Sequence, residues 1–309
     1  MESDFLHWLR ERLPPHPLLK VGIGDDAAVL ATAGRSDIVV TTDLIAAAVD
    51  FDLQTDDPRR VGHKALAINL SDLAAMAAKP LAAVVSLNLP RHGGMKLATQ
   101  LYEGLLPLAD QFHLAIAGGD TNSWDGPLVV SVTALGEVTA DGPLTRRGAQ
   151  PGDRIIVTGA FGGSILGRHL DVRPRIEEAL LLNQRYTLHA GIDSSDGLSL
   201  DLWHICEESR CGAVIEVDRV PIAAAASELS KQRADGVSPL DHALSDGEDF
   251  ELILAVPPES AERMLADQPL EGAPVSDIGR FVSDRGLWTQ GQSRSRQLIT
   301  PRGFEHRFT

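Results

Sequence analysis

The stretch RVGHKALAINLSDLAAMAAKPLAAVVSLNLP, residues 60–90, decides the fold class of this chain. Its first part, 60–80, repeats apolar residues with the period of an amphipathic helix, and we expect Lys79-Pro80 to stop that helix. Its second part, 81–90, is an apolar run closed by Pro90, which is typical of a buried strand. A helix that passes at once into a buried strand predicts a layered α/β structure.

The same alternation of helices and strands continues on both sides of this stretch. We expect helices at 4–13, 95–112, 176–189 and near 259–266. We expect strands at 37–43, 114–121, 127–138, 154–159, 212–217, 250–256, 275–282 and 286–290. The turn-rich run TRRGAQPGD (145–153) indicates a boundary, so we predict an N-terminal domain at 1–147 and a C-terminal α/β domain at 148–309, with mixed sheets.

Composition limits the possible partners. The 309 residues include 28 Lys plus Arg against 43 Asp plus Glu, a formal net charge of −15. That balance argues against nucleic acid and anionic membranes, but it allows anionic substrates if metal ions mediate the contact. The N-terminus lacks the apolar core of a signal peptide, and Cys206 and Cys211 are best explained as ordinary reduced thiols. We therefore expect a cytoplasmic protein.

The main chemical signal is a set of acids that we place where apolar elements meet small-residue turns. The set is Asp25, Asp26, Asp43, Asp72, Asp120, Asp193 and Asp196. Any one of them has a structural explanation: Ser71 or Asp72 could cap a helix, and Asp120 or Asp196 could close a turn. At the ends of strands that share a sheet edge, however, the carboxylates would converge and repel unless cations neutralise them. Oxygen ligands suit Mg²⁺ or Mn²⁺, and neighbouring glycines leave room for phosphate oxygens, so the set predicts nucleotide phosphate chemistry.

The common nucleotide motifs do not account for this set. GIGDDA (22–27) lacks the third glycine and the preceding strand of a dinucleotide fingerprint. GAFGGSIL (159–166) lacks the Lys-Ser/Thr of a P-loop, and a tight turn is its simpler explanation.

Seven blocks of sequence resemble, in order and spacing, the thiamine-monophosphate kinases of the aminoimidazole-ribonucleotide synthetase superfamily. They are GIGDDAAVL (22–30), TTD (41–43), GHKALAINLSDLAAMAAKP (62–80), AGGDT (117–121), LTRRGAQPGD (144–153), IDSSDGLSLDLWHI (192–205) and GEDFEL (247–252). The resemblance implies two α/β domains, with N-terminal domains that bind ATP and Mg²⁺ and pair in a homodimer. It implies transfer of the γ-phosphoryl group of ATP to thiamine phosphate, with several Mg²⁺ ions and ATP bound between the halves.

The resemblance also implies roles for individual residues. Metal-site positions are Asp26, Thr41, Thr42, Asp43, Asp72, Asp120, Asp193 and Asp196. Nucleotide-contacting positions are Gly119, Asp120, Arg146 and Ser195, and we expect Asp120, Asp196 and Arg146 to act in catalysis. Substrate-contacting positions are Asp50, Glu248 and Phe304, since an acid and an aromatic face suit a cationic thiazolium. Phosphoryl transfer needs mainly positioning and charge neutralisation, which explains the number of acids.

The acceptor half departs from the family pattern. Ala47 stands where the family has a glutamate, Asp50 replaces a substrate-contacting histidine, and Asp246 replaces a glycine. Asp50 beside a phosphorylated acceptor must turn away or be bridged by a cation. A related ATP-dependent kinase or synthetase with another acceptor is the first alternative, and a nucleotide-binding module without turnover is the second. Selenophosphate synthetase and the hydrogenase-maturation relative are disfavoured, because the cysteines that they use are missing at the expected positions.

Overall fold

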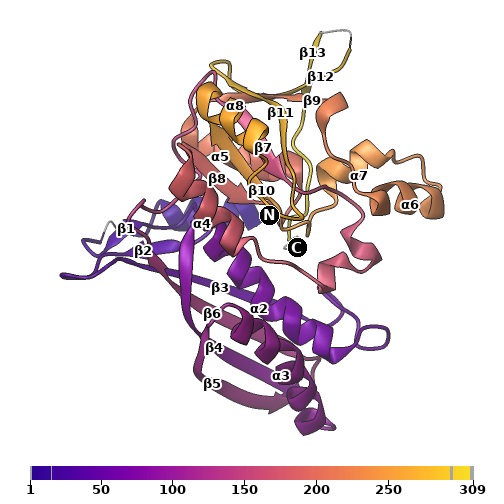
Figure 1. The fold of residues 1–309 in the computed structure, drawn as a ribbon. Helices are drawn as coiled ribbons and strands as arrows, with labels where there is room; N and C mark the ends of the chain where they lie inside the picture. Colours follow the sequence, from indigo (N-terminus) through magenta and orange to yellow (C-terminus); the bar gives the residue numbers. More distant parts are fainter. Residues whose placement is uncertain (1, 15, 293–294, 307–309) are drawn as a thin grey trace.

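The computed structural model describes residues 2–14, 16–292 and 295–306, which form two mixed sheets with helices packed against them (Figure 1). The first sheet has the order β1-β2-β3-β6-β4-β5. Its strands are β1 (Leu19–Val21), β2 (Ala28–Leu30), β3 (Ile38–Ala46), β4 (Ala78–Pro90), β5 (Ala115–Trp124) and β6 (Val129–Val138). Only β4 and β5 pair in parallel, so the sheet is largely antiparallel.

The second sheet has the order β13-β12-β9-β11-β7-β10-β8. Its strands are β7 (Arg154–Thr158), β8 (Ala190–Asp193), β9 (Gly212–Glu216), β10 (Leu252–Val256), β11 (Val275–Val282), β12 (Leu287–Gln290) and β13 (Arg296–Ile299). Around it lie α4 (Ile176–Arg185), α5 (Leu198–Ser209), α6 (Ala224–Arg233), α7 (Pro239–Ser245) and α8 (Pro258–Asp267). The predicted boundary at 147/148 falls in the connection between β6 and β7, and it stays a prediction.

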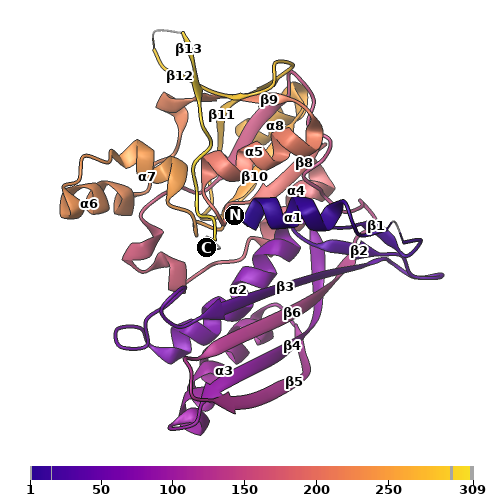
Figure 2. The same cartoon turned by 180° about the vertical axis from the view of Figure 1, so that it is seen from behind.

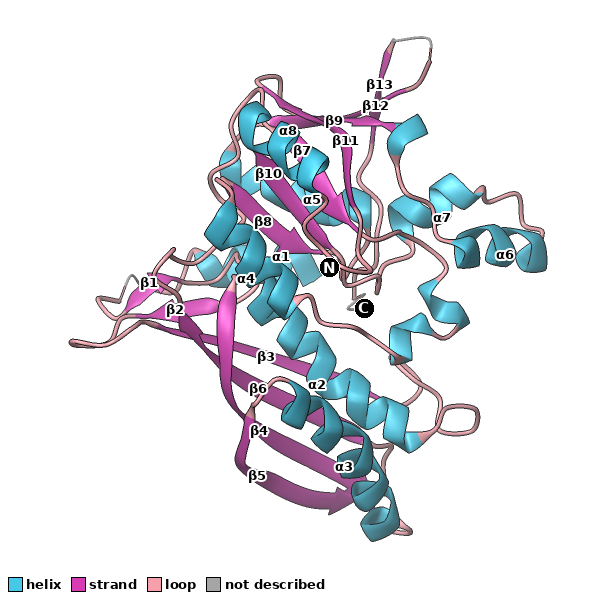
Figure 3. Cartoon of the chain, in the orientation of Figure 1, coloured by secondary structure: helices cyan, strands magenta, loops and turns pink. Residues whose placement is uncertain are grey.

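Helix α2 (Pro58–Ala75) is the element that joins the two halves. The Asp57 side chain caps it by accepting the Arg59 N–H, and Pro58 supplies a preset first turn. With α3 (Gly94–Gln111) it covers one face of the first sheet (Figure 3). It also packs against α4 and β8 of the second half, so one apolar core runs from Val39 to Leu254 across both sheets. A second core lies on the other face of the second sheet, beneath α5.

The crossing of α2 and α3 depends on two glycines. A Cβ on Gly62 would lie 1.9 Å from the Leu101 carbonyl oxygen, and one on Gly104 would lie 1.7 Å from the Arg59 carbonyl oxygen. Each helix therefore presents bare backbone to the other at the crossing. The opposite face of the first sheet is open, and Leu44 on it is 62% exposed.

The short helix α1 (Glu2–Arg10) reaches the second half of the chain, although it belongs to the first. The Arg10 guanidinium donates to the two carboxylate oxygens of Glu208 in α5 at 2.6 and 3.3 Å. Figure 2 shows α1 between the two sheets, on the side turned away in Figure 1. Within the described residues, no helix combines the length and apolarity that crossing a membrane requires.

The expected α/β layering is confirmed, but the ends of three helices were placed too late: α1 ends at Arg10 rather than at residue 13, α4 ends at Arg185 rather than at residue 189, and α2 also ends early. Helix α2 stops at Ala75, and Lys79-Pro80, expected to stop it, lies inside β4. Ala77 adopts a φ of +48°, which turns the chain directly into the strand. A register shift between Pro80 and Ala82 accommodates the proline, which has no N–H for the ladder. The elements β1, β2, β8, β13, α5, α6 and α7 were not predicted.

Candidate active site

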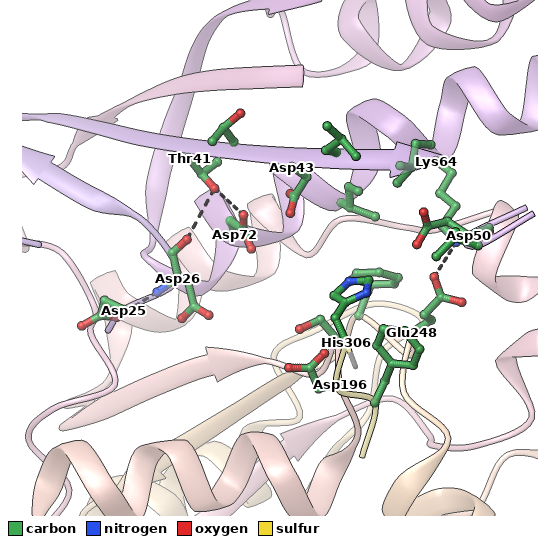
Figure 4. Close-up of a pocket in the computed structure, with 18 of the residues that line it drawn as sticks. Asp25, Asp26, Thr41, Asp43, Asp50, Lys64, Asp72, Asp196, Glu248 and His306 are labelled. Carbon is green, nitrogen blue, oxygen red and sulfur yellow. Dashed lines mark hydrogen bonds and ion pairs between the residues drawn. The ribbon is translucent and has the colours of Figure 1, made fainter. Parts of the chain in front are cut away.

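Two adjoining cavities of about 410 and 900 Å³ lie between the halves of the chain. They share the residues Asp25, Asp26, Thr41, Thr42, Arg146, Asp196 and Phe304. We call the smaller one the acceptor cavity and the larger one the α1 cavity. Figure 4 shows Asp25 and Asp26 at one end of the acceptor cavity, Asp43 and Asp72 between, and Lys64, Asp50 and Glu248 at the other end.

Three aspartates from distant parts of the chain meet at the centre of the site. Asp26 comes from the loop before β2, Asp72 from α2, and Asp193 from the end of β8. One carboxylate oxygen of each lies within 4.8 Å of those of the other two. Neighbouring hydroxyls hold two of them: Thr41 Oγ1 donates to Asp72, and Ser71 Oγ donates to Asp193 at 2.5 Å. Since Asp72 lies well inside α2, the helix-cap explanation for Ser71 or Asp72 is wrong.

Burial and mutual repulsion raise the pKa of these carboxyls. Desolvation, then the charges of Asp43, Asp193 and Asp26, raise the pKa of Asp72 well above its usual value. Desolvation, followed by repulsion from Asp26, raises the pKa of Asp193 to about 8. Burial raises the pKa of Asp43 to about 6. Each of these carboxyls is therefore easier to protonate than an isolated aspartate.

Arg146 is the cation that the structure itself places against the acids. Its Nη2 lies 2.6 Å from Asp26 Oδ1, and its backbone N–H donates to Asp25 Oδ1 at 3.0 Å. Its side chain is only 21% exposed, so Arg146 is not a solvated linker residue. The guanidinium opposes the rise that desolvation causes in the Asp26 pKa.

The cluster fits a hard divalent cation. Asp26 Oδ2 and Asp193 Oδ1 are buried and accept no hydrogen bond within the described part of the chain. Buried carboxylate oxygens are normally paired, so these two are suited to a ligand that neutralises them. The donors are all oxygens, which favours Mg²⁺ or Mn²⁺ over softer metals.

Besides Asp72, which lies inside α2, two of the acids lie within strands rather than at their ends, contrary to expectation. Asp43 lies within β3 and Asp120 within β5. Asp43 still reaches the site, because its side chain lies on the helix-covered side of the sheet. Asp120 and Gly119, however, are exposed on the edge strand β5 and line neither cavity. The expectation that all seven acids converge is therefore wrong for Asp120 in a single chain.

The remaining positions predicted to hold metal or to contact the nucleotide lie in or beside the cavities. Thr42 lines both cavities, although its Oγ1 donates to the Val132 carbonyl at 3.1 Å. Ser195 and Asp196 follow β8 and line the acceptor cavity. The Ser195 carbonyl accepts the Glu248 N–H at 2.7 Å, which ties this loop to the acceptor end.

The three positions predicted to contact the substrate line the acceptor cavity. Asp50 turns its carboxylate back onto its own loop, where Oδ2 accepts the Ala46 N–H at 2.7 Å. Phe304 is 51% exposed and packs edge-on against His306, with ring centroids 4.9 Å apart, so ordinary core packing does not explain it. Its N–H donates to the Asp196 carbonyl at 2.9 Å.

Sequence reasoning missed several residues of the site. Lys64 lines the acceptor cavity and pairs with Glu248. Asp201 and His204 of α5 lie beside Asp196, and burial lowers the pKa of His204 to about 4. Asp201 Oδ2 accepts the Asp196 and Gly197 N–H groups and so fixes the 194–197 loop. The spacing of Asp201 and His204, three residues apart as on one face of a helix, was the available signal.

Comparison with known proteins shows which protein family has this fold. Residues 24–138 match the family AIR synthase related protein, N-terminal domain, and residues 150–289 match AIR synthase related protein, C-terminal domain. The chain therefore has the two-domain fold of the AIR synthase-related proteins, with its acid cluster between the domains.

Individual relatives narrow the class. The thiamine-monophosphate kinase of Rhodopirellula baltica is 45% identical, over 99% of this chain and 97% of its own length. That of Caulobacter vibrioides is 34% identical, over 90% and 82%. The structure of AaThiL complexed with AMPPCP and TMP aligns with a TM-score of 0.81 at 25% identity, over 98% of this chain and 95% of that chain. The thiamine-monophosphate kinase from Stenotrophomonas maltophilia aligns with a TM-score of 0.72 at 32% identity, over 93% and 94%. This chain belongs to the thiamine-monophosphate kinase family.

Proposed function

We propose that this chain transfers the γ-phosphoryl group of ATP to thiamine phosphate and so forms thiamine diphosphate. The observation that carries the proposal is a cleft of two adjoining cavities, whose lining includes Asp26 and Asp72 of the acid cluster together with Glu248 and Phe304. An acid and an aromatic face suit the cationic ring of the acceptor, and the acids suit metal-bound phosphates. The activity itself is inferred from the similarity of this chain to the thiamine-monophosphate kinases named above.

The residues act mainly by positioning and by balancing charge. The attacking acceptor phosphate is mostly ionised near pH 7, since its second pKa is ~6, so a strong general base is not required. Arg146, held against Asp26, suits a phosphate oxygen, because a guanidinium donates in a planar fork. Asp26, Asp43, Asp72, Asp193 and Asp196 would hold Mg²⁺, which when bound neutralises the phosphates of both substrates.

The departure at Asp50 is compatible with thiamine phosphate. Its carboxylate is engaged by the Ala46 N–H rather than pointed at an acceptor phosphate. Asp246, at the second departure, accepts the Gly163 N–H at 2.8 Å and pairs with His242, so it braces the GAFGGS turn. Both residues support the local loops, which favours the family acceptor over a different one.

The proposal includes a homodimer formed through the open face of the first sheet. Leu44 and Leu81 are exposed there, and Asp120 and Gly119 lie on its edge strand. The roles proposed for Asp120 and Gly119 require this face to approach a nucleotide bound in the dimer. Light scattering that gave the mass of one chain would exclude the dimer. A cytoplasmic location stays a prediction, consistent with the free thiols of Cys206 and Cys211.

The test is ATP consumption with a panel of phosphorylated acceptors and identification of the products by mass spectrometry. We expect thiamine diphosphate from thiamine phosphate and Mg²⁺-ATP. Turnover of another acceptor, with none of thiamine phosphate, would establish the alternative of a related kinase. A thermal shift with Mg²⁺-ATP but no turnover of any acceptor would establish the nucleotide-binding module.

A further inference from the structure

Lys64 is a buried cation at the acceptor end, and nothing above explains it. It lies inside α2, its side chain is 1% exposed, and it lines the same cavity as Asp72 on that helix. A buried ammonium is costly unless charge and hydrogen bonds compensate it. Lys64 Nζ finds both, since it pairs with the Glu248 carboxylate and donates to the Asp50 carbonyl at 2.9 Å. The ion pair therefore bridges the two halves of the chain across the cleft (Figure 4).

The Glu248 partner sits in a strained loop. Glu248 has a φ of +54° and Phe250 a φ of +51°, a region that residues with side chains rarely occupy. Two hydrogen bonds hold this backbone, from Glu248 N–H to the Ser195 carbonyl and from Phe250 N–H to the Ser194 carbonyl, both 2.7 Å. Strained residues persist where the surroundings over-determine them, often at functional sites. The backbone bonds fix the loop, and Lys64 fixes the direction of the carboxylate.

The second partner of Lys64 is the turn at 46–50, where the sequence departs from its family. This turn is closed from within: Asp50 Oδ2 accepts the Ala46 N–H, and Asp50 N–H donates to the Ala46 carbonyl at 3.0 Å. Ala48 within it has a φ of +68°. Lys64 binds the Asp50 carbonyl of this closed turn.

We propose that Lys64 is the positioning residue of the acceptor end, where it joins α2, the 46–50 turn and the Glu248 loop into one surface that accepts a substrate carrying both a cationic ring and a phosphate. Its positive charge balances Glu248 beside Asp50 and Asp43. The carboxylate can then face a thiazolium without adding a net negative charge against the acceptor phosphate. This inference rests on the proposed function, because the acceptor is taken to be thiamine phosphate.

The experiment compares Lys64→Met, Lys64→Arg, Glu248→Gln and the double variant Lys64→Met/Glu248→Gln with the wild type. Steady-state kinetics give kcat and separate KM values for thiamine phosphate and ATP, and thermal melts give the shift with Mg²⁺-ATP. Lys96→Met, at an exposed lysine on α3, is the matched control and should leave every value unchanged.

We expect Lys64→Met to raise the KM for thiamine phosphate at least tenfold, while the KM for ATP and the Mg²⁺-ATP thermal shift change less than twofold. Lys64→Arg should recover part of the loss. In the Glu248→Gln background Lys64→Met should add less than twofold, because the carboxylate that it positions is gone. This last comparison still decides the matter if Lys64→Met alone does not fold.

Three outcomes would overturn the inference. They are an unchanged acceptor KM in Lys64→Met, equal rises in both KM values, and a Lys64→Met effect that is as large with Glu248→Gln as without it. A wild-type protein that does not turn over thiamine phosphate is a separate result, since it defeats the proposed function before any variant is compared.

Discussion

Asp72 is the residue on which the acid cluster depends. It lies inside α2, accepts from the Thr41 hydroxyl and faces the carboxylates of Asp26 and Asp193. Replacing it with asparagine removes a charge that repels its neighbours but keeps the shape of the side chain. We expect Asp72→Asn to lower kcat/KM by about 100-fold or more, because a metal ligand is lost. The Tm without metal should hold or rise, because repulsion is relieved.

Kinetics and thermal melts with and without Mg²⁺ check the Asp72 prediction. Asp125→Asn, at an exposed surface aspartate, is the control and should behave as wild type. An Asp72→Asn protein that melts earlier without metal, yet keeps its activity, would show that the carboxylate serves the fold rather than the site.

For single residues, the sequence predicted which kinds of side chain form the site better than it predicted where each one lies in the fold. Clustered aspartates indicated a cation site, and Asp26, Asp72 and Asp193 do meet. Asp120 shares their motif type but lies on an exposed edge, because pairing along β4 and β5 decides where that side chain goes. Lys64 was missed, because a lysine in an amphipathic helix normally lies in solvent, whereas here tertiary contacts with the Asp50 carbonyl and with Glu248 hold a buried side chain.

At the scale of elements, the packing of α2 against α3 fixes the position of α2 and therefore of its site residues, Lys64 and Asp72. We expect Gly62→Ala or Gly104→Ala to lower the free energy of unfolding by about 1–3 kcal/mol or more, because a Cβ would meet carbonyl oxygens at under 2 Å. Gly22→Ala is the control, since a Cβ there meets nothing within 4 Å. Urea titration measures all three, and a loss no larger than in the control would show that the helices separate freely.

Element types could be predicted where the apolar pattern is long, as in α2, α3 and the central strands of both sheets. The predicted ends of helices and strands were wrong where the backbone makes an unusual turn. The pattern in MAAKP gave no sign that Ala77 would take a left-handed φ and release the chain into β4. Short elements such as β13 and α6 have too few residues to show a period, so tertiary packing decides them.

At the scale of the whole molecule, the acids link stability to pH and to metal. The Asp193 pKa of about 8 lies above the ~3.9 of an unfolded chain, and that of Asp43 is also raised, to about 6. The folded state therefore binds more protons than the unfolded state between pH 4 and 8. The contribution of these groups to stability thus falls as pH rises through that window. Mg²⁺ competes with the same protons, so its stabilising effect should grow with pH.

We expect the Mg²⁺-induced rise in Tm to be larger at pH 8.5 than at pH 6, measured by calorimetry against samples in EDTA. Asp193→Asn should flatten the pH dependence of the metal-free protein, because it removes the group with the pKa of about 8. Equal Mg²⁺ shifts at both pH values would mean that the cluster does not exchange protons for metal.

The α1 cavity is closed by parts of the chain that are made at very different times. Leu6 and Arg10 of α1 form one wall, and Phe304 and Glu305 form another. On the ribosome the first wall emerges early, and both sheets are complete at Ile299, before the second wall exists. A polypeptide stopped at that point would contain both apolar cores and still lack a side of its cavity. Because Phe304 follows both sheets in the chain, the cavity can be closed only after the two apolar cores have been synthesised.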